Sequence, residues 1–276
     1  MRHPSLNKIF IYPVKSLAGI AIESARVTPL GLENDRRWMI VDSQGRFITQ
    51  RLYPQLSQIK TSIESDQIVL TPLTGEGITL PLTLEVRPTR TVKVWHDQVE
   101  SMPMSDAENQ WVSEYLDIDC QFVYMPDSTV RPIDPEFATS DNDRVSFADG
   151  FPFLLISQAS LEDLNQRLQH KNLSPVPIER FRPNLLIEGC DAYAEDQWTS
   201  FDLSGNRFHG VKPCSRCIMT TIDPVTGTKG VEPFQTLKEY RMRGKKAYFG
   251  QNALLDLSYN HSFTLNIGDL VENILL

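Results

Sequence analysis

A pair of cysteines, Cys214 and Cys217, is the pattern with the most chemical content in this sequence. The chain has 4 cysteines, and the other two, Cys120 and Cys190, stand alone, with no His-x-x-x-His segment to complete a zinc site. A thioredoxin-type pair begins a helix, whereas this pair precedes the β-branched run Ile-Met-Thr-Thr-Ile, which predicts a strand over 218–222. We therefore expect the pair at the start of a strand, where neither common use of a C-x-x-C pair fits.

Two uses remain for the pair. Free cysteines are often buried for packing alone, so two structural thiols at the edge of a loop are one alternative. Arg216, which lies between the two cysteines, favours the other. A neighbouring guanidinium stabilises a thiolate in its reactive, metal-binding form, and a thiolate suits a soft or high-valent metal. The sequence therefore favours a metal-binding thiolate.

Two basic clusters lie near the N-terminus. Lys15 and Ser16 follow the first expected strand, and a cation with a hydroxyl on a turn can hold a phosphate, although such turns are more often only solvated. Arg36 stands just before another strand, where a salt bridge to Asp35 or Glu33 is the simpler explanation. Neither cluster identifies a ligand by itself.

Arg182 and Asn184 precede an apolar strand, so their side chains are expected at the end of a sheet. A guanidinium fork and an amide together can bind the oxygen and nitrogen edge of a heterocycle. Other common chemistries lack support: His96, His170 and His209 have no partners for a hydrolytic triad. The glycines form neither a GxGxxG nor a P-loop pattern, so the sequence gives no support for an NAD or ATP site.

The elements that must position these residues are mostly strands. In the first half, short alternating or β-branched runs broken by Gly, Pro and Asn predict an antiparallel barrel or curled sheet. The expected strands are 9–14, 20–27, 37–42, 46–51, 67–70, 78–86 and 91–99. An amphipathic helix over 106–118, with Ser105 as its N-cap, closes this unit.

The second half repeats the β-rich character around two expected helices. Leu161, Leu164 and Leu168 follow helical spacing behind an N-cap at Ser157 or Ser160. A shorter helix is expected over 234–241, and strands over 151–156, 184–188, 208–212, 218–222 and 263–267. The fold class is therefore β-rich α+β, with a barrel-like unit over 1–126 and a second unit over 127–276. Residues 127–150 form a long connecting loop, either a linker or a lid over a pocket.

The composition limits the partners. The chain of 276 residues has 27 basic and 35 acidic side chains and a net charge of −8, which disfavours binding to nucleic acid or to an anionic membrane. Neither a signal peptide nor an apolar membrane span is indicated. The widely spaced cysteines suit a reducing compartment. We expect a cytoplasmic protein that binds a small molecule or another protein.

Seven segments together resemble the MOSC family, the molybdenum cofactor sulfurase C-terminal domains, and within it the amidoxime-reducing components. They are Tyr-Pro-Val-Lys-Ser near residue 15, Asp-Arg-Arg-Trp near 36, Phe-Leu-Leu-Ile-Ser-Gln-Ala-Ser-Leu at 153–161, Phe-Arg-Pro-Asn at 181, Tyr-Ala-Glu-Asp-x-Trp at 193, Cys-Ser-Arg-Cys-x-x-Thr-Thr-x-Asp-Pro-x-Thr-Gly at 214 and Phe-Gly-Gln at 249. The resemblance covers nearly the whole chain. It implies an N-terminal MOSC β-barrel domain followed by a MOSC β-barrel domain with peripheral helices.

The resemblance also implies roles for individual residues. In this family the second cysteine of the pair ligates molybdenum, which implies Cys217, whereas Cys214 is not a ligand. The residues implied to hold the molybdopterin are Lys15, Ser16, Arg36, Arg182, Asn184, Ser215 and Arg216, with Asp149, Gly150 and Asn252 as walls of the site. The sequence departs from the family around Asp149, where Asp-Gly-Phe-Pro replaces the more polar Asp-Thr-Ser-Pro.

The activity implied by the resemblance is the molybdenum-cofactor-dependent reduction of N-hydroxylated compounds, such as amidoximes, N-hydroxy bases and hydroxylamines. The chain ends at Leu276 without a C-x4-C-x2-C ferredoxin pattern, so a separate redox protein of the ferredoxin, flavodoxin or cytochrome type is expected to supply electrons. Two alternatives remain. One is a cofactor carrier or sulfur-handling module without its own turnover, and the other is a β-rich domain with structural cysteines.

Overall fold

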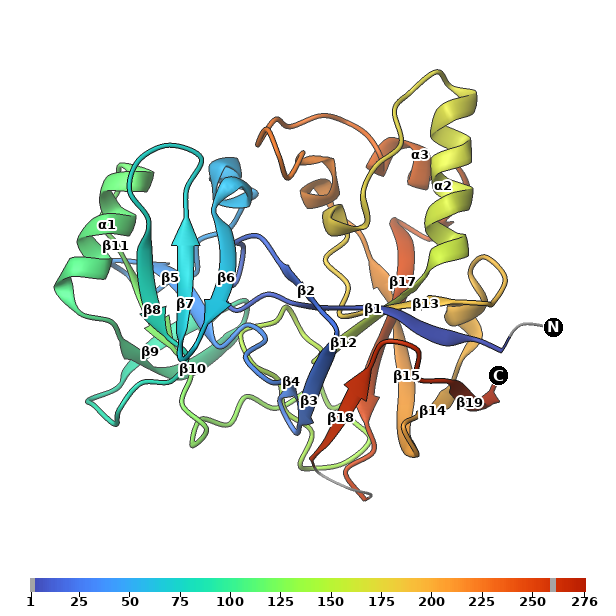
Figure 1. Ribbon diagram of the computed structural model, residues 1–276, viewed down its shortest axis with the longest axis horizontal. Coiled ribbons are helices and arrows are strands. Elements are labelled where there is room, and N and C mark those ends of the chain that lie inside the picture. The colour runs from blue at the N-terminus through green and yellow to red at the C-terminus, as the bar shows by residue number, and fades with distance from the viewer. Residues whose placement is uncertain (1–2, 259–261) are drawn as a thin grey trace.

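A computed structural model describes residues 3–258 and 262–276 of the chain. Its two β-rich parts lie side by side, and the larger part is built on a nine-stranded sheet (Figure 1). The strand order of this sheet is β19 (Val271–Leu275), β14 (Ser200–Leu203), β15 (Asn206–Ser215), β17 (Lys246–Leu255), β12 (Phe153–Ser157), β13 (Leu185–Glu188), β1 (Ser5–Ile11) and β2 (Ile20–Ile22), with β16 (Met242–Arg243) paired to β17. Neighbours are antiparallel except for the parallel pair of β12 and β13.

The large sheet is buried on both faces, because successive side chains of a strand point to opposite sides. In β12, Leu154 and Ile156 pack with the helices, whereas Phe153 and Leu155 pack with the opposite face. The helices on the first face are α2 (Gln158–His170) and α3 (Phe234–Tyr240). A three-stranded sheet of β18 (Phe263–Asn266), β3 (Ser24–Thr28) and β4 (Gly31–Leu32) covers the other face.

The smaller part contains two further sheets around its own core. One has the order β5 (Trp38–Asp42), β11 (Cys120–Tyr124), β10 (Asp97–Pro103) and β9 (Arg90–Val94), and the other has the order β6 (Lys60–Glu64), β7 (Gln67–Thr71) and β8 (Ile78–Pro81). The helix α1 (Asp106–Leu116) packs on this core through Val112 and Leu116. Short 3-10 helices are η1 (Pro54–Gln58), η2 (Ile178–Arg180), η3 (Ala194–Gln197) and η4 (Ile218–Thr221).

The predicted fold class is confirmed, since the chain is sheet-rich with three helices at its periphery among the described residues. The helices begin where expected, and Ser157 is the N-cap of α2, with its hydroxyl accepting a bond from the Ser160 amide at 3.1 Å. Sheet pairing adds a feature that the sequence does not indicate: β1 and β2 belong to the large sheet. The division at residues 126 and 127 stays a prediction.

Two predicted strands are wrong, and two others are divided in the structure: 20–27 contains β2 and part of β3, and 91–99 runs from β9 through a turn into β10. Residues 218–222 begin with the 3-10 helix η4, because the hydroxyls of Thr220 and Thr221 bond back to the carbonyls of Cys217 and Ile218 and stabilise tight i to i−3 turns. Residues 46–51 make only isolated bridges to neighbouring strands. The prediction also missed β4, β6, β11, β14, β16, β19 and the long central strand β17.

Candidate functional site

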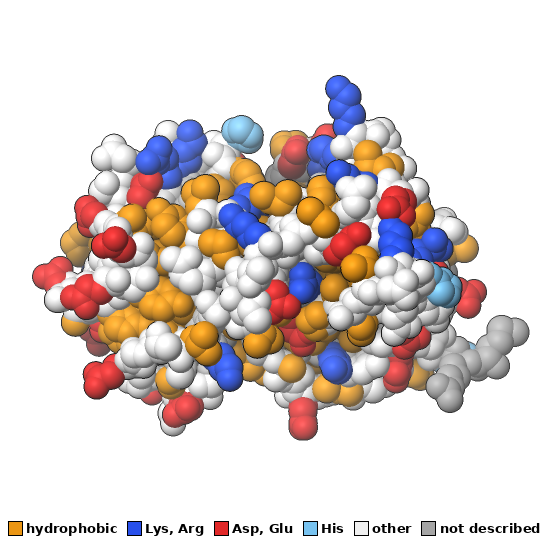
Figure 2. Space-filling model, turned by 90° about the horizontal axis from the view of Figure 1, so that it is seen from above, with side chains coloured by type: hydrophobic (Ala, Val, Ile, Leu, Met, Phe, Trp, Pro, Cys, Tyr) orange, Lys and Arg blue, Asp and Glu red, His pale blue; other side chains and the backbone are white. Residues whose placement is uncertain are grey.

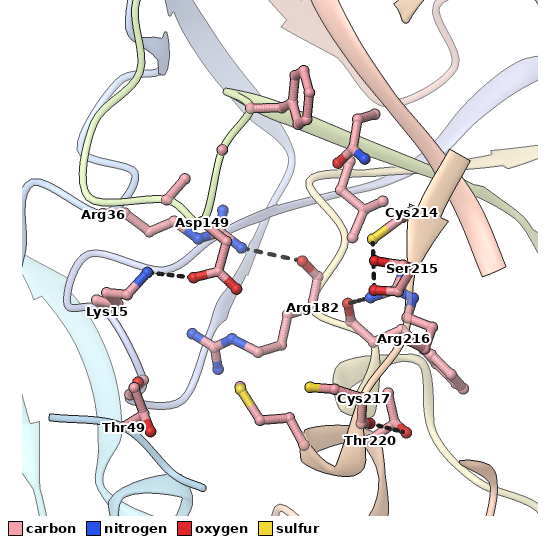
Figure 3. A pocket seen from close by; sticks show the side chains of 18 of the residues that line it. Lys15, Arg36, Thr49, Asp149, Arg182, Cys214, Ser215, Arg216, Cys217 and Thr220 are labelled. Carbon is pink, nitrogen blue, oxygen red and sulfur yellow. Dashed lines mark hydrogen bonds and ion pairs between the residues drawn. The ribbon is translucent and has the colours of Figure 1, made fainter. Parts of the chain in front are cut away.

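One cavity brings together the residues that the sequence singled out. It lies where segments from both halves of the chain meet, and the space inside it, counted with the open mouth, is about 860 Å³. All eleven predicted site residues line it: Lys15, Ser16, Arg36, Asp149, Gly150, Arg182, Asn184, Ser215, Arg216, Cys217 and Asn252 (Figure 3). The sequence missed further lining residues, among them Thr49, Arg51, Arg180, Met219 and Thr220.

Three of the eleven predicted site residues have a strained backbone. Ser16, Arg36 and Arg182 have φ values of 72°, 51° and 55°, in the left-handed region that costs about 1–3 kcal/mol for a residue other than glycine. Hydrogen bonds hold the chain there: the Arg36 amide donates to the Tyr12 carbonyl at 2.8 Å and the Arg182 amide to the Glu179 carbonyl at 3.3 Å. Strain of this kind is typical of functional sites, where it fixes the direction of a side chain.

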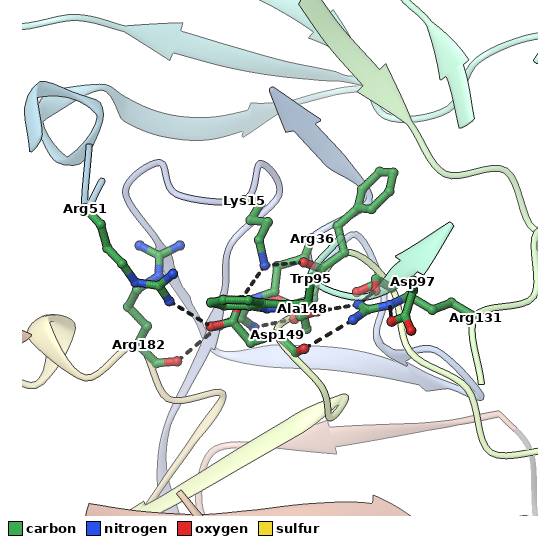
Figure 4. A network of polar contacts seen from close by, with 12 residues as sticks. Lys15, Arg36, Arg51, Trp95, Asp97, Arg131, Ala148, Asp149 and Arg182 are labelled. Carbon is green, nitrogen blue, oxygen red and sulfur yellow. Dashed lines mark hydrogen bonds and ion pairs between the residues drawn. The ribbon is translucent and has the colours of Figure 1, made fainter. Parts of the chain in front are cut away.

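Lys15 and Asp149 form the ion pair at one side of the cavity (Figure 4). The Lys15 ammonium, whose side chain is 7% exposed, donates to Asp149 Oδ1 at 2.5 Å and to the Phe147 carbonyl at 2.7 Å. Burial lowers the pKa of Lys15 to about 8, although Asp149 opposes the shift. The Asp149 side chain is 60% exposed, and although partial desolvation would raise its pKa, the charges of Lys15 and Arg51 hold that pKa well below its usual range. The pair is therefore ionised at neutral pH.

Arg131 holds the segment that carries Asp149. Its buried guanidinium donates to the carbonyls of Ser146 at 2.9 Å and Ala148 at 2.5 Å and to the Asp149 carbonyl at 3.2 Å, while Nε pairs with Asp97 (Figure 4). The expected long loop 127–150 contains no helix or strand. Its last residues are nevertheless fixed as a wall of the cavity.

Arg36 is bound to several partners at once. It forms the ion pair with Asp35 at 2.5 Å that the sequence suggested as an alternative, and both side chains are nearly buried. The Arg36 guanidinium also donates two hydrogen bonds of 3.2 Å, from Nη1 to Asn184 Oδ1 and from Nη2 to the Arg182 carbonyl. Asn184 also accepts from the Leu154 amide at 3.3 Å. Asn184 thus lines the cavity, but its amide connects protein segments.

Three guanidiniums that line the cavity have a buried nitrogen without a partner among the described residues: Arg180 at Nε, and Arg182 and Arg216 at Nη2. Arg182 donates to the Leu17 carbonyl at 2.6 Å, and Arg216 donates to the carbonyls of Phe249 at 2.8 Å and Phe181 at 2.9 Å. The Nη2 atoms of both arginines are buried and bond to none of the residues that the structure describes. Burial also lowers the pKa of Arg182 to about 10. Unsatisfied buried donors are costly, so the cavity fits an anionic, oxygen-rich group.

The cysteine pair lies at the end of a strand, which corrects the expected start of one. Cys214 is within β15 and Cys217 follows it as the N-cap residue of η4. The two thiols are free and point in different directions (Figure 3). Burial raises the pKa of the Cys214 thiol, and Arg216 offsets this only in part. Because a protonated thiol is a poor ligand, the raised pKa makes Cys214 a poor candidate for a metal ligand.

The donor set of the chain limits what metal chemistry fits. Among residues 3–258 and 262–276, no three His, Cys, Asp or Glu side chains group around a possible metal position. A metal at Cys217 would therefore take its other ligands from a non-protein group. The dithiolene of a molybdopterin supplies such ligands, and its phosphate matches the surrounding cations, so the residues present fit the molybdenum cofactor.

Comparison with known proteins identifies the class. Residues 3–119 match the family profile described as the MOSC N-terminal beta barrel domain, and residues 142–272 match the MOSC domain. The chain belongs to the MOSC family. It is 33% identical to human "Mitochondrial amidoxime-reducing component 1" over 284 residues, which cover 97% of this chain and 82% of that protein.

Two further likenesses are more limited. The chain is 31% identical to the rice (Oryza sativa subsp. japonica) protein "Molybdenum cofactor sulfurase", covering 89% of this chain and 32% of that protein. The YuaD protein from Bacillus subtilis aligns with a TM-score of 0.39 and 9% identity over 98% of this chain and 96% of that chain. No helix in the described part of the chain has the length and apolar character needed to cross a membrane.

Proposed function

We propose that this protein is a molybdenum-cofactor-dependent reductase of N-hydroxylated compounds. The observation that carries the proposal is the convergence of all eleven predicted residues on one cavity, in which three buried guanidinium nitrogens lack partners among the described residues. The relationship to amidoxime-reducing components over 97% of the chain gives the reaction class. Within the cavity, Cys217 provides the thiolate for the metal.

The basic residues bind the anionic end of the cofactor. Lys15, Arg36 and Arg182 are already charged and fixed by backbone carbonyls, so little reorganisation is needed when an anion enters. Ser16 adds a hydroxyl beside them. Arg216 holds the chain next to Cys217 and offers its free Nη2 to an acceptor atom. Gly150 leaves open space at the wall, since an added Cβ would meet nothing within 4 Å.

The cofactor, when bound, supplies the two-electron redox chemistry, and the protein supplies position and charge. An amidoxime, N-hydroxy base or hydroxylamine gains two electrons and two protons, its N–O bond breaks, and water and an N–H product leave. The electrons come from a separate redox protein of the ferredoxin, flavodoxin or cytochrome type. The proposal includes two further predictions from the sequence. The chain divides into two structural units after residue 126, and the protein is located in the cytoplasm.

The carrier alternative is not favoured. The relative named as a sulfurase is matched over 32% of its own length, whereas the human amidoxime-reducing component is matched over 82%. A carrier would bind the same anion, so binding alone does not separate the two functions.

The test is turnover by the isolated, cofactor-loaded chain. We expect reduction of an amidoxime with reduced methyl viologen and none with NADH or NADPH alone, because the sequence has no nicotinamide, flavin or iron–sulfur pattern. Rapid NADH-driven turnover would contradict the need for a separate donor. A lack of turnover with viologen in loaded protein would favour the carrier.

A further inference from the structure

Exposed apolar side chains lie on two segments, 51–60 and 218–231, that also contribute residues to the lining of the cavity. The two segments meet: the Gln58 amide donates to the Val225 carbonyl at 3.1 Å, and Lys229 Nζ donates to the Arg51 carbonyl at 2.6 Å. We define the mouth patch by its four most exposed apolar residues, whose exposed fractions are 72%, 53%, 75% and 71%: Leu52, Ile218, Val225 and Val231. These side chains expose apolar surface without an evident structural role.

The mouth patch lies close to the candidate metal position. Ile218 follows Cys217 directly, and the Gly230 amide donates to the Thr221 carbonyl at 3.1 Å, which holds Val231 beside η4. From above, hydrophobic and basic side chains are interspersed with other groups across the middle of the molecule (Figure 2). A molecule seated on this patch would be near the cavity.

The charge around the patch is opposite to that of the whole chain. Residues 51–60 and 218–231 contain three basic side chains and one acidic side chain, although the chain carries a net charge of −8. The basic ones are Arg51, Lys60 and Lys229, of which Lys60 and Lys229 are exposed. The acidic one, Asp223, is neutralised by Arg180 at 2.7 Å. Arg51 is paired with Asp149 at 3.7 Å, so the remaining charge of these segments is that of Lys60 and Lys229. The rim is therefore locally positive.

We propose that the mouth patch is the docking surface for a small acidic ferredoxin that delivers electrons to the site, an inference that rests on the proposed function. An apolar centre with a charged rim is the usual anatomy of a protein interface, and opposite charge steers and orients a partner. A second copy of this chain fits less well, because self-docking would place the positive rims together. Two reduced ferredoxins are oxidised by one electron each, solvent supplies two protons, and the N–O bond of the substrate is reduced.

The test uses surface variants of the cofactor-loaded protein and two donors. Val231→Asp and Lys229→Glu alter the patch at two positions that do not themselves line the cavity. Val86→Asp is the matched control, because Val86 is 98% exposed in the connection between β8 and β9. Rates are measured with reduced plant-type ferredoxin and with reduced methyl viologen, and ferredoxin binding is measured by calorimetry.

We expect both patch variants to lower the ferredoxin kcat/KM and affinity about tenfold or more, while the viologen rate and the Val86→Asp control stay unchanged. An equal loss with viologen, unchanged ferredoxin kinetics, or a faster rate for Lys229→Glu would overturn the proposal. If loaded wild-type protein fails with viologen, the proposed function fails. In that case calorimetry still tests whether ferredoxin binds at the mouth patch. If Lys229→Glu does not weaken ferredoxin binding, the proposed docking surface is wrong.

Discussion

At the scale of single residues, the site is marked by residues with an unfavourable backbone conformation and by buried donor atoms that lack an acceptor. Ser16, Arg36 and Arg182 adopt left-handed backbone, and Arg182 and Arg216 keep an unpaired buried nitrogen among the described residues. Both features reduce the stability of the empty protein. An anionic ligand would recover part of that free energy, which is why these positions indicate binding and not only packing.

Exchange of the two cysteines tests their different roles. Cys217→Ser is expected to abolish amidoxime reduction and to lower molybdenum retention, because the serine hydroxyl is a weaker ligand than a thiolate. Cys214→Ser should keep much of both, since Cys214 is a partly buried thiol with a raised pKa. Molybdenum content and viologen-driven rate are compared in the two variants. Equal losses in both would refute the assignment of Cys217.

Lys15 predicts a pH dependence of anion binding. Its folded-state pKa of about 8 lies below the ordinary lysine value, so the ammonium becomes neutral as the pH rises through 8. The affinity of the cofactor-free protein for sulfate should therefore fall about tenfold at most between pH 7 and pH 9. The pH trend of stability is the reverse of the trend in sulfate affinity. Between pH 8 and the ordinary lysine pKa, Lys15 keeps its proton in the unfolded chain but loses it in the folded one, so its contribution to the free energy of unfolding rises with pH.

The matched control for this prediction is Lys15→Arg, which keeps its charge over the whole range. Calorimetric titration with sulfate, whose own charge is constant, measures both proteins. A wild-type affinity that does not change with pH, or the same loss in the arginine variant, would contradict the role given to Lys15.

At the scale of elements, the sequence predicted best where local and tertiary preferences agree. The helical spacing of Leu161, Leu164 and Leu168 correctly predicted α2, and all three side chains are buried in the core. The run at 218–222 misled because β-branched threonines bond back to carbonyls and form η4. The strand β17 was missed because Gly250 and polar residues interrupt its apolar pattern. At Gly250 an added Cβ would lie 2.7 Å from the Leu155 carbonyl.

The N-cap of α2 gives a prediction about stability. Ser157 accepts a hydrogen bond from the Ser160 amide, whereas Ser105 at the start of α1 makes no cap bond with its side chain. Ser157→Ala should lower the free energy of unfolding by about 1–2 kcal/mol, and Ser105→Ala by clearly less. Denaturant titration of the cofactor-free proteins measures both values. A Ser105→Ala loss as large as that of Ser157→Ala would contradict this account of the cap.

At the scale of the whole molecule, the cavity depends on the meeting of both halves. Lys15, Arg36 and Arg51 come from the first fifth of the chain, and the cysteine pair comes from the end of β15. Sequence motifs identified most of these residues. They did not identify Thr49, Arg51 or Arg180, because those side chains reach the cavity only through tertiary packing. The inclusion of β1 and β2 in the large sheet was hidden for the same reason.

The central claim is that this cavity holds a molybdenum cofactor through Cys217. The most direct measurement is the molybdenum and pterin content of the protein purified from a host that makes the cofactor, with a known molybdoprotein from the same host as control. The account predicts about one molybdenum and one pterin per chain, with metal lost in Cys217→Ser. Wild-type protein that contains neither, beside a fully loaded control, would contradict it.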